Sequence, residues 1–336
     1  NKTTLYGAFE NLLDEIKDDE RFRPDLVVYI GGHIVSKKLK SYLRSLKGVE
    51  QIRISQEADI EDTFMHLTKV MDLPNSDAMS WLGNFGWHNH WEDYRRLWMD
   101  ALAKSYERKE NFKPEFSSLA TVKEFFSQLQ KVEPQDFKAF TLGGKDAQDD
   151  GIYDRKFDTF LPGLMSSVIS GNSSAIRLMN LYADRHVYCN RGVNGIEGSL
   201  STAVGFSMCK NKSDKHVYCV LGDLSFFYDQ NALWNRNLNG KLRIIVLNNG
   251  GGAIFGKFQG LKESQAREEM IMAKHHATAE GICSQNEVKY LAAHTMEEME
   301  QGISQLIHAE SERPMLLEVF TDMDVDNEML EAIQKC

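Results

Sequence analysis

Short apolar runs that end abruptly in Gly, Asp, Asn or Ser recur through the second half of the chain, and they constrain its fold more than any other feature. The runs are MSSVISG, HVYCN, HVYCVLG, RIIVLNN and MLLEVF, with helix-like segments between most of them. Strands that are apolar throughout, rather than at every second residue, are typical of parallel sheets with helices on both faces. The pattern therefore predicts an α/β fold built on a doubly wound parallel sheet.

A smaller pattern of the same kind lies near the start of the chain. DLVVYI is an apolar strand followed by Gly-Gly and an amphipathic helix, and EQIRIS follows as a second strand, which is the order of a parallel βαβ unit. Residues 1–86 hold too few such units for a complete sheet, so we expect them to form part of a Rossmann-like middle domain. Helical spacing from Trp87 predicts a connecting helix over 87–115, and 116–336 should form the second domain, with a surface excursion over 131–162.

The length, net charge and composition of the chain argue against several classes of protein. The chain has 336 residues, about two domains at ~150 residues each, and its net charge of −10 argues against nucleic acid as the main partner. No apolar run approaches the ~18 residues of a membrane span, so a soluble, cytoplasmic protein is expected. The five cysteines form no C-x-x-C pair and are expected to be reduced thiols. His88 and His90 are two apart and would face different sides of a helix, so no metal site is expected there.

Ligands of parallel α/β sheets bind outside the carboxyl ends of the strands, which directs attention to the residues that follow each strand. Gly171-Asn172-Ser173-Ser174 follow the first strand of the second domain, and such small residues at a helix start suit an anion. Arg177, one turn into that helix, could add a bidentate contact to a carboxylate or phosphate. The alternative interpretation is a capped helix with a surface arginine.

The glycines after HVYCN do not form a dinucleotide-binding fingerprint. Gly192, Gly195 and Gly198 are spaced as G-x-x-G-x-x-G rather than G-x-G-x-x-G, and no acidic residue ends a following strand at the required distance. A nicotinamide site is therefore disfavoured. The spacing does allow the backbone to approach a flat ligand closely, with Ile196 beside it.

Two further strand ends are informative only as a pair. Asp223 follows one strand and Asn249 the next, 26 positions later, which leaves room for one helix and a return strand of the same sheet. Each alone is the usual composition of a turn. Together, a carboxylate oxygen, an amide oxygen and the carbonyl of Gly251 would give three hard oxygen ligands, which suit Mg²⁺ bound also to a diphosphate and a water.

This arrangement resembles the cofactor motif of thiamine-diphosphate-dependent enzymes. The stretches GNSSAIRL and CNRGVNGIEGSLSTAVG make the resemblance closest to the menaquinone-pathway synthases of that family, of which the chain resembles the C-terminal portion. The resemblance is close over about 165–260 and looser in GGHIVSKKLKSYL. It implies thiamine diphosphate and Mg²⁺ (or Mn²⁺) as cofactors, decarboxylation of 2-oxoglutarate with transfer of the succinyl unit to isochorismate, and a homodimer or homotetramer.

The resemblance also implies roles for individual residues. Asp223, Asn249 and the Gly251 carbonyl would bind the metal. The residues implied to bind the cofactor are Gly192, Asn194, Gly195, Ile196, Gly222, Asp223, Leu224, Ser225, Asn249, Gly251 and Gly252. The residues implied to bind the substrates are Lys37, Lys38, Asn172, Ser173, Arg177 and Arg191, with Ile254 and Phe255 as an apolar wall.

Some features depart from the family pattern. The family usually has Lys-Arg where this chain has Lys37-Lys38, which replaces a bidentate contact with a point charge, and it usually has Asn at the position of Gly250. The glutamate that activates the cofactor belongs to a pyrimidine-binding domain that we do not find in this chain, so the chain alone is expected to be inactive.

Two other functions stay open at this point. One is another thiamine-dependent enzyme, a 2-oxoacid decarboxylase or an acetohydroxyacid synthase, and the other is a non-catalytic α/β binding module. Arg177, Arg191, Lys37 and Lys38 argue against the first, because a pyruvate enzyme would not need them. The intact pair of Asp223 and Asn249 argues against the second.

Overall fold

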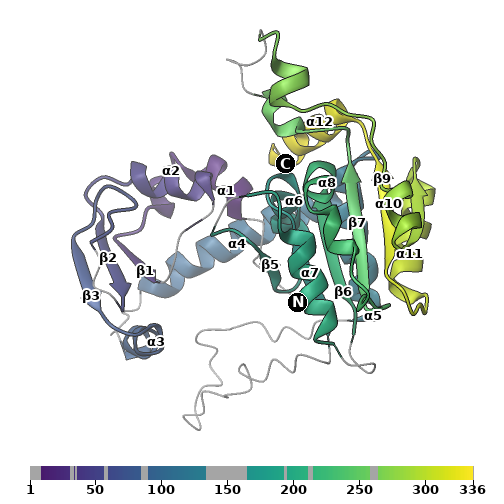
Figure 1. Cartoon of the computed structure of the whole chain (residues 1–336). Helices are drawn as coiled ribbons and strands as arrows, with labels where there is room; N and C mark the ends of the chain where they lie inside the picture. Colours follow the sequence, from purple (N-terminus) through teal and green to yellow (C-terminus); the bar gives the residue numbers. More distant parts are fainter. Residues whose placement is uncertain are drawn as a thin grey trace. The chain divides into compact units, whose positions relative to one another are not determined.

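The computed structural model describes residues 9–30, 34, 36–56, 60–84, 90–133, 165–192, 195–210, 215–257 and 264–335 (Figure 1). The chain divides into two compact units. One comprises residues 1–6 and 113–333, and the other comprises 7–112 and 334–336. Each is described by itself.

The larger unit is built on a six-stranded parallel sheet, and the predicted doubly wound α/β fold is confirmed. The strand order is β5-β4-β6-β7-β9-β8. The chain leaves β4 for one edge and returns to the middle for β6 and β7. In order, the strands are β4 (Ser167–Ser170), β5 (Val187–Cys189), β6 (Val217–Gly222), β7 (Leu242–Asn248), β8 (Lys289–Ala293) and β9 (Met315–Phe320).

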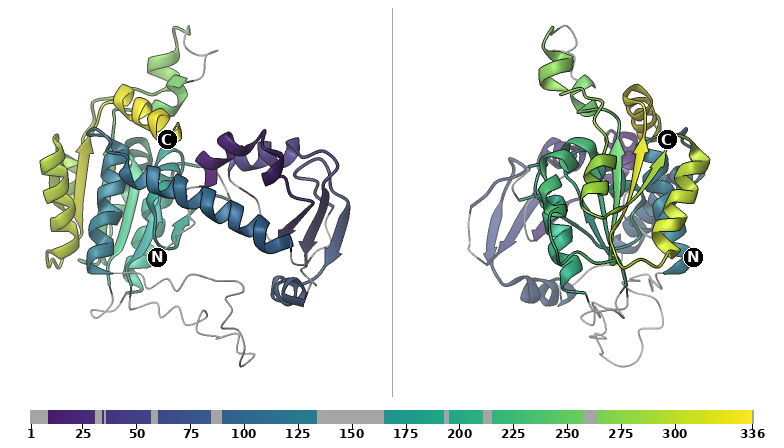
Figure 2. Two further views of the ribbon diagram at one scale, coloured as in Figure 1. Left: turned by 180° about the vertical axis from the view of Figure 1, so that it is seen from behind. Right: turned by 45° about the vertical axis from the view of Figure 1, so that its right-hand side comes forward.

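Helices cover both faces of this sheet, as Figure 2 shows. On one face α5 packs against α6 and α11, and on the other α7 packs against α8 and η3. The elements of this unit are α5 (Ser118–Val132), α6 (Ser174–Tyr182), α7 (Ser199–Met208), α8 (Asp223–Tyr228), η3 (Gln230–Leu233), η4 (Ala253–Lys257), η5 (Arg267–Ile271), α10 (Glu280–Gln285), α11 (Met296–His308) and α12 (Met323–Gln334).

Burial explains why the strands are apolar at every position. In β7, Ile244 and Val246 belong to a core cluster with Leu200 and Phe226, while Ile245 between them is just as inaccessible. Successive residues of a strand point to opposite faces, so both faces of β7 are buried. Burial on both faces is the physical reason that this strand could be predicted from its apolar sequence.

Two strands differ from the sequence-based expectation. The sheet has a sixth strand, β8, at its edge, which the five predicted runs did not include. A short strand, β3 (Lys69–Asp72), also went unpredicted in the smaller unit. The N-cap of α5 is Ser117, whose Oγ accepts the hydrogen bond from Ala120 N.

The smaller unit contains a three-stranded parallel sheet in the order β1-β2-β3, with β1 at Leu26–Ile30 and β2 at Glu50–Ser55. Its core joins α1, α2 and α4, with the Phe22 and Trp98 rings edge to face at 5.3 Å. The helix expected over 87–115 is α4, which packs within this unit. The helices are α1 (Phe9–Ile16), η1 (Glu20–Phe22), α2 (Lys37–Ser45), α3 (Asn75–Asn84) and α4 (His90–Asn111).

The remaining expectations about the organisation of the chain stay predictions. Most of the 131–162 excursion and His88 lie outside the described residues. The assignment of the two units to a middle domain and a cofactor-binding domain is likewise an expectation. Within the described part of the chain, no helix combines the length and the apolarity that crossing a membrane requires.

Candidate functional site

The ends of β6 and β7 lie side by side, as the sequence predicted. The two strands pair in parallel, with Gly222 opposite Leu247. Asp223 begins α8 directly after β6, and Asn249 directly follows β7. The two strand ends that carry the candidate metal ligands therefore meet at the carboxyl edge of the sheet.

Asp223 connects the two turns directly. Its carboxylate is only 3% exposed, its Oδ1 accepts from Leu224 N at 2.6 Å, and its Oδ2 accepts from Gly251 N at 2.8 Å. Gly251 has φ = 147°, and a Cβ at this position would lie 2.6 Å from Met272 O. Only glycine fits this conformation and this space, so the glycine run is needed for the loop to reach Asp223.

His275 is a basic neighbour of Asp223. Its Nε2 lies 3.2 Å from Asp223 Oδ2, and its ring packs edge to face on Phe227 at 5.2 Å. This close contact with the Asp223 carboxylate raises the pKa of His275, and burial of the ring acts in the opposite direction. The structure thus places a basic group on the carboxylate that the sequence assigns to a metal.

Asn249 is held by a carboxylate that the sequence did not point to. Asn249 Nδ2 donates to Asp326 Oδ2 at 2.8 Å, and Asp326 lies in the first turn of α12. Burial raises the pKa of Asp326, while hydrogen bonds from Asn249, Ser118 and Thr321 oppose the rise. Asp326 is therefore a half-buried acceptor whose hydrogen bonds hold the surroundings of Asn249.

The preceding residue, Asn248, is held in a similar way by Glu318 of β9. Asn248 Nδ2 donates to Glu318 Oε1 at 2.7 Å and to Ala277 O at 3.0 Å, and its Oδ1 accepts from Gly250 N at 3.1 Å. Glu318 is fully buried. All of these contacts lie within the unit, so Asn248 fixes the loop itself.

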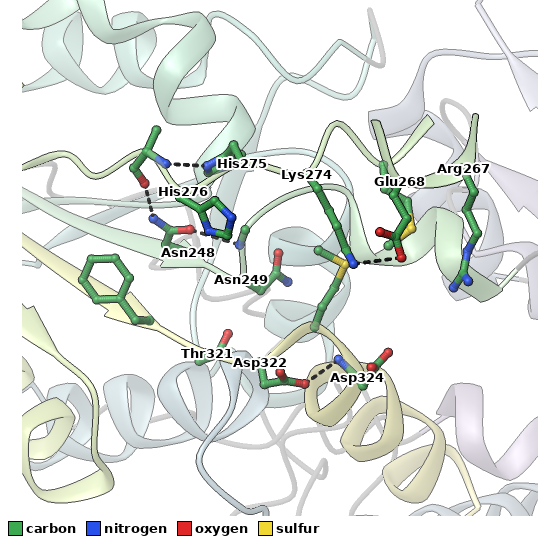
Figure 3. A pocket seen from close by; sticks show the side chains of 15 residues that line it. Asn248, Asn249, Arg267, Glu268, Lys274, His275, His276, Thr321, Asp322 and Asp324 are labelled. Atoms are coloured by element: carbon green, nitrogen blue, oxygen red, sulfur yellow. Dashed lines mark hydrogen bonds and ion pairs between the residues drawn. The ribbon is translucent and has the colours of Figure 1, made fainter. Parts of the chain in front are cut away.

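A pocket of about 540 Å³ lies next to this loop (Figure 3). Asn249 lines it, together with residues of both charge signs from the segment before α10 and the turn before α12. Lys274 Nζ forms an ion pair with Glu268 across 3.0 Å at its rim. Asp223 and Ser225 do not line this pocket, so it adjoins the candidate metal ligands without enclosing them.

The end of β4 forms a second polar cluster. Asn172 Oδ1 accepts from Arg191 Nη1 at 3.1 Å, and Asn172 Nδ2 donates to Asn190 O and Gly195 O. Three of the predicted residues, Asn172, Arg191 and Gly195, are thus in contact. The conformation of Ser173, φ = 67° and ψ = −123°, is strained for a residue other than glycine, and such strain occurs most often at functional sites.

The structure brings several of the other predicted residues near these two clusters. A Cβ at Gly171 would lie 2.9 Å from Leu221 Cβ and 3.7 Å from Ser225 Oγ, so the end of β4 lies against the start of α8. Ile254 lines a small cavity together with Asn249, and the ring of Phe255 packs against Gly252. Their roles remain predictions.

The rest of the predicted residues are more scattered. Ile196 and Gly192 lie in the loop before α7, and Arg177 is exposed on α6. Lys37 and Lys38 begin α2 of the other unit, where Lys38 Nζ lies 2.6 Å from Asp14 Oδ2. Asn194 lies outside the described residues.

Sequence reasoning missed three residues of the site: His275, Glu318 and Asp326. Glu318 is the one charged residue within the apolar run MLLEVF, and a charge at a position buried on both faces is a signal that could have been used. Asp326 lies in TDMDVDN, which looks like an ordinary acidic helix start, and His275 lies in a segment without strand or helix periodicity. For these two we find no local signal.

The donor set of the site fits a hard divalent cation. It offers the buried carboxylate of Asp223 and the amide oxygen of Asn249, next to a glycine loop whose backbone can approach closely. Mg²⁺ takes oxygen ligands of this kind and usually shares them with phosphate oxygens. The residues therefore fit both the metal and the diphosphate that the motif implies.

Comparison with known proteins supports the thiamine-diphosphate part of this expectation. Residues 170–319 match the family described as thiamine pyrophosphate enzyme, C-terminal TPP binding domain. The chain is similar to 2-succinyl-5-enolpyruvyl-6-hydroxy-3-cyclohexene-1-carboxylate synthases, with 32% identity over 322 residues in Phocaeicola vulgatus and 33% over 334 residues in Christiangramia forsetii. These matches cover 93% and 97% of this chain, but 49% and 51% of the relatives. The chain therefore spans about half the length of the curated relatives that it matches.

Proposed function

We propose that this chain is the diphosphate-binding and metal-binding part of a 2-succinyl-5-enolpyruvyl-6-hydroxy-3-cyclohexene-1-carboxylate synthase. The chain contains the C-terminal domain of the thiamine pyrophosphate enzyme family and is a relative of those synthases. The full protein would decarboxylate 2-oxoglutarate and transfer the succinyl unit to isochorismate, in menaquinone biosynthesis. The observation that carries the proposal is the hydrogen bond from Gly251 N to Asp223 Oδ2, which joins the two halves of the cofactor motif.

The proposed roles at the metal follow from the contacts of the loop. Asp223 and Asn249 would bind Mg²⁺ or Mn²⁺ with the Gly251 carbonyl as a third ligand, and the cation would take the place of His275 beside Asp223. Leu224, Ser225 and Gly252 would border the diphosphate. Thiamine diphosphate supplies the electron sink for the decarboxylation, and the chain supplies orientation and charge.

The proposed substrate contacts involve the second cluster. Arg191 has an Nε that is buried without a hydrogen-bond partner, while its Nη1 is anchored on Asn172. A guanidinium with an unused donor suits a carboxylate, and both substrates carry carboxylates. Ser173 and Arg177 would add to this role, and Ile254 and Phe255 would contact apolar parts of the substrates. Lys37 and Lys38, in the other unit, are proposed as substrate contacts from the family resemblance alone.

Three further parts of the proposal concern the whole protein. We expect the activating glutamate in the half of the relatives' length that this chain does not span. We also expect a homodimer or homotetramer, as in the family. The free thiols of Cys189, Cys209, Cys219 and Cys283 are compatible with the reducing conditions of the cytoplasm.

Calorimetry of the full-length protein with Mg²⁺ and thiamine diphosphate tests the cofactor assignment. The wild type should bind, and Asp223→Asn should bind more than roughly 100-fold more weakly, because loss of a ligand should exceed the 10–100-fold effect of an outer partner. Asp93→Asn changes a side chain that is 82% exposed and should bind as the wild type does. Equal affinities of Asp223→Asn and the wild type would disprove the cofactor site.

An assay of the same protein distinguishes the substrates. Consumption of 2-oxoglutarate together with isochorismate supports the synthase. Consumption of pyruvate alone would assign the chain instead to a 2-oxoacid decarboxylase or an acetohydroxyacid synthase. A protein that binds the cofactor but turns over neither set would be a binding module.

A further inference from the structure

The orientation of the Asn249 amide is set by Asp326. Asn249 Nδ2 donates to Asp326 Oδ2 at 2.8 Å. An ionised carboxylate has acceptors only, so the amide must present its nitrogen to Asp326 and its oxygen to the opposite side. Among the residues that the structure describes, none donates a hydrogen bond to Asn249 Oδ1.

Asp326 is itself held rigidly by residues of two other elements. Its Oδ1 accepts from Ser118 N at 2.7 Å, and its Oδ2 accepts from Ser118 Oγ at 2.7 Å and from Thr321 Oγ1 at 3.1 Å. Ser118 begins α5, and Thr321 follows β9. With Asn249, this gives the carboxylate four donors, so it has no freedom to turn away.

The neighbouring asparagine shows that this arrangement is specific to Asn249. Asn248 Nδ2 is also held by a carboxylate, that of Glu318, but its Oδ1 is used within the loop by Gly250 N. The oxygen of Asn248 is therefore already engaged within the loop. Asn249 combines a fixed nitrogen with an oxygen that no described residue uses.

We propose that Asp326 is a positioning residue of the metal site, which fixes the Asn249 amide with its oxygen toward the cation. This role rests on the proposed function, because it requires Asn249 to be a metal ligand. Asp326 does not touch the metal in this scheme. It determines which atom of Asn249 does.

Asp326→Asn tests the role with nearly unchanged size. Ser118 N can only donate, so the new side chain must keep its oxygen there, and its NH₂ then faces Asn249 and the hydroxyls of Ser118 and Thr321. Hydroxyls can accept, but the NH₂ of Asn249 cannot. Asn249 would turn over, bind the new donor through its oxygen, and present NH₂ to the cation.

The measurement is Mn²⁺ affinity, by electron paramagnetic resonance of free Mn²⁺, on full-length protein saturated with thiamine diphosphate. Asp326→Asn should weaken binding roughly 10–100-fold, the usual effect of losing an outer partner of a ligand. Glu328→Gln is the matched control, since Glu328 is an exposed acidic residue of the same helix and does not line the pocket that Asn249 lines, and it should bind as the wild type does.

Two comparisons separate positioning from a merely structural role. Asp326→Ala removes all four hydrogen bonds and should lower the thermal midpoint more than Asp326→Asn, yet it should weaken Mn²⁺ binding no more, because Asn249 is then free to turn its oxygen to the metal. The double variant Asn249→Asp with Asp326→Asn should recover most of the affinity, because a carboxylate at 249 can accept from the new amide with one oxygen and bind Mn²⁺ with the other.

The outcomes that overturn the role differ from those that overturn the function. If the wild type binds Mn²⁺ and Asp326→Asn binds it equally, the positioning role is wrong and the cofactor site stands. If Mn²⁺ affinity follows the thermal midpoint through all the variants, Asp326 is only structural. If the wild type itself binds no Mn²⁺ with thiamine diphosphate present, the proposed function fails and this role fails with it.

Discussion

The two ends of β7 both bury polar side chains, but they use them differently. At the amino end, Arg243 is fully buried, and its guanidinium donates to Leu306 O at 3.0 Å, to Ala309 O at 2.9 Å and to Gly240 O. At the carboxyl end, Asn249 has one atom fixed by Asp326 and one that no described residue uses.

The difference indicates what each end contributes. Each nitrogen of the Arg243 guanidinium donates to a backbone carbonyl of the same unit. Two of these carbonyls, of Leu306 and Ala309, lie at the end of α11 and lack a partner within the helix, so the guanidinium stabilises the fold. The carboxyl end keeps the Asn249 oxygen available for a partner, beside the buried carboxylate of Asp223 at the end of the paired strand β6. We therefore expect substitutions at the amino end to change stability alone, and those at the carboxyl end to change metal affinity.

The largest effect on stability should come from Arg243→Met. Removing the guanidinium leaves several buried carbonyls without a donor, and we expect a loss of about 3–5 kcal/mol in the free energy of unfolding, as when one partner of a buried charged contact is removed. Urea unfolding of the full-length protein measures it. The Mn²⁺ affinity of the protein that remains folded should be unchanged.

Arg236→Met is the matched control for this prediction. Arg236 is exposed, and its loss should change stability by no more than about 0.5 kcal/mol. A large drop in Mn²⁺ affinity of folded Arg243→Met would break the proposed division between the two ends.

The sequence predicted most of the strands and the residues that directly follow them, but not the partners that packing brings from distant parts of the chain. Four of the five predicted strands, β4, β6, β7 and β9, are buried on both faces, and the fifth, β5, is a half-buried edge strand. The unpredicted KYLAA of β8 lies at the other edge and has an exposed lysine and three partly or fully exposed neighbours. Asp223 and Asn249 were found because each directly follows a strand. Asp326 lies 77 positions from Asn249, and only the packing of α12 brings it there.

A moderate effect should come from Glu318→Gln. Ala279 N and Tyr290 OH both donate to Glu318 Oε2, so the glutamine oxygen must stay there, and its NH₂ then meets Asn248 Nδ2. Asn248 cannot turn over, because Ala277 O and Gly250 N hold both of its atoms. We expect a loss of about 1–3 kcal/mol in unfolding free energy, the cost of an unsatisfied buried donor.

This variant sharpens the comparison, because Glu318 belongs to the carboxyl end but makes only internal contacts. Its Mn²⁺ affinity should fall less than that of Asp326→Asn. Glu300→Gln changes an exposed glutamate and should have no measurable effect on either quantity. A larger loss of Mn²⁺ affinity in Glu318→Gln than in Asp326→Asn would show that Asn248 rather than Asn249 controls the metal.

The smallest effect at neutral pH should come from His216, which precedes β6 at the amino end. Burial, and then the positive charges of Arg243, Lys241 and Lys215, lower the pKa of His216 to about 4 from its ordinary 6.5. Above pH 6.5 neither the folded nor the unfolded state binds the proton. As the pH falls from 6.5 to 4, the unfolded state binds the proton first, so stability is lost, by about 2 kcal/mol at pH 5.

His216→Gln should remove this part of the acid sensitivity. The measurement is the difference in unfolding free energy between pH 7.5 and pH 5, compared between the variant and the wild type. If both lose the same stability over that range, His216 is not held neutral by its burial and by the positive charges beside it.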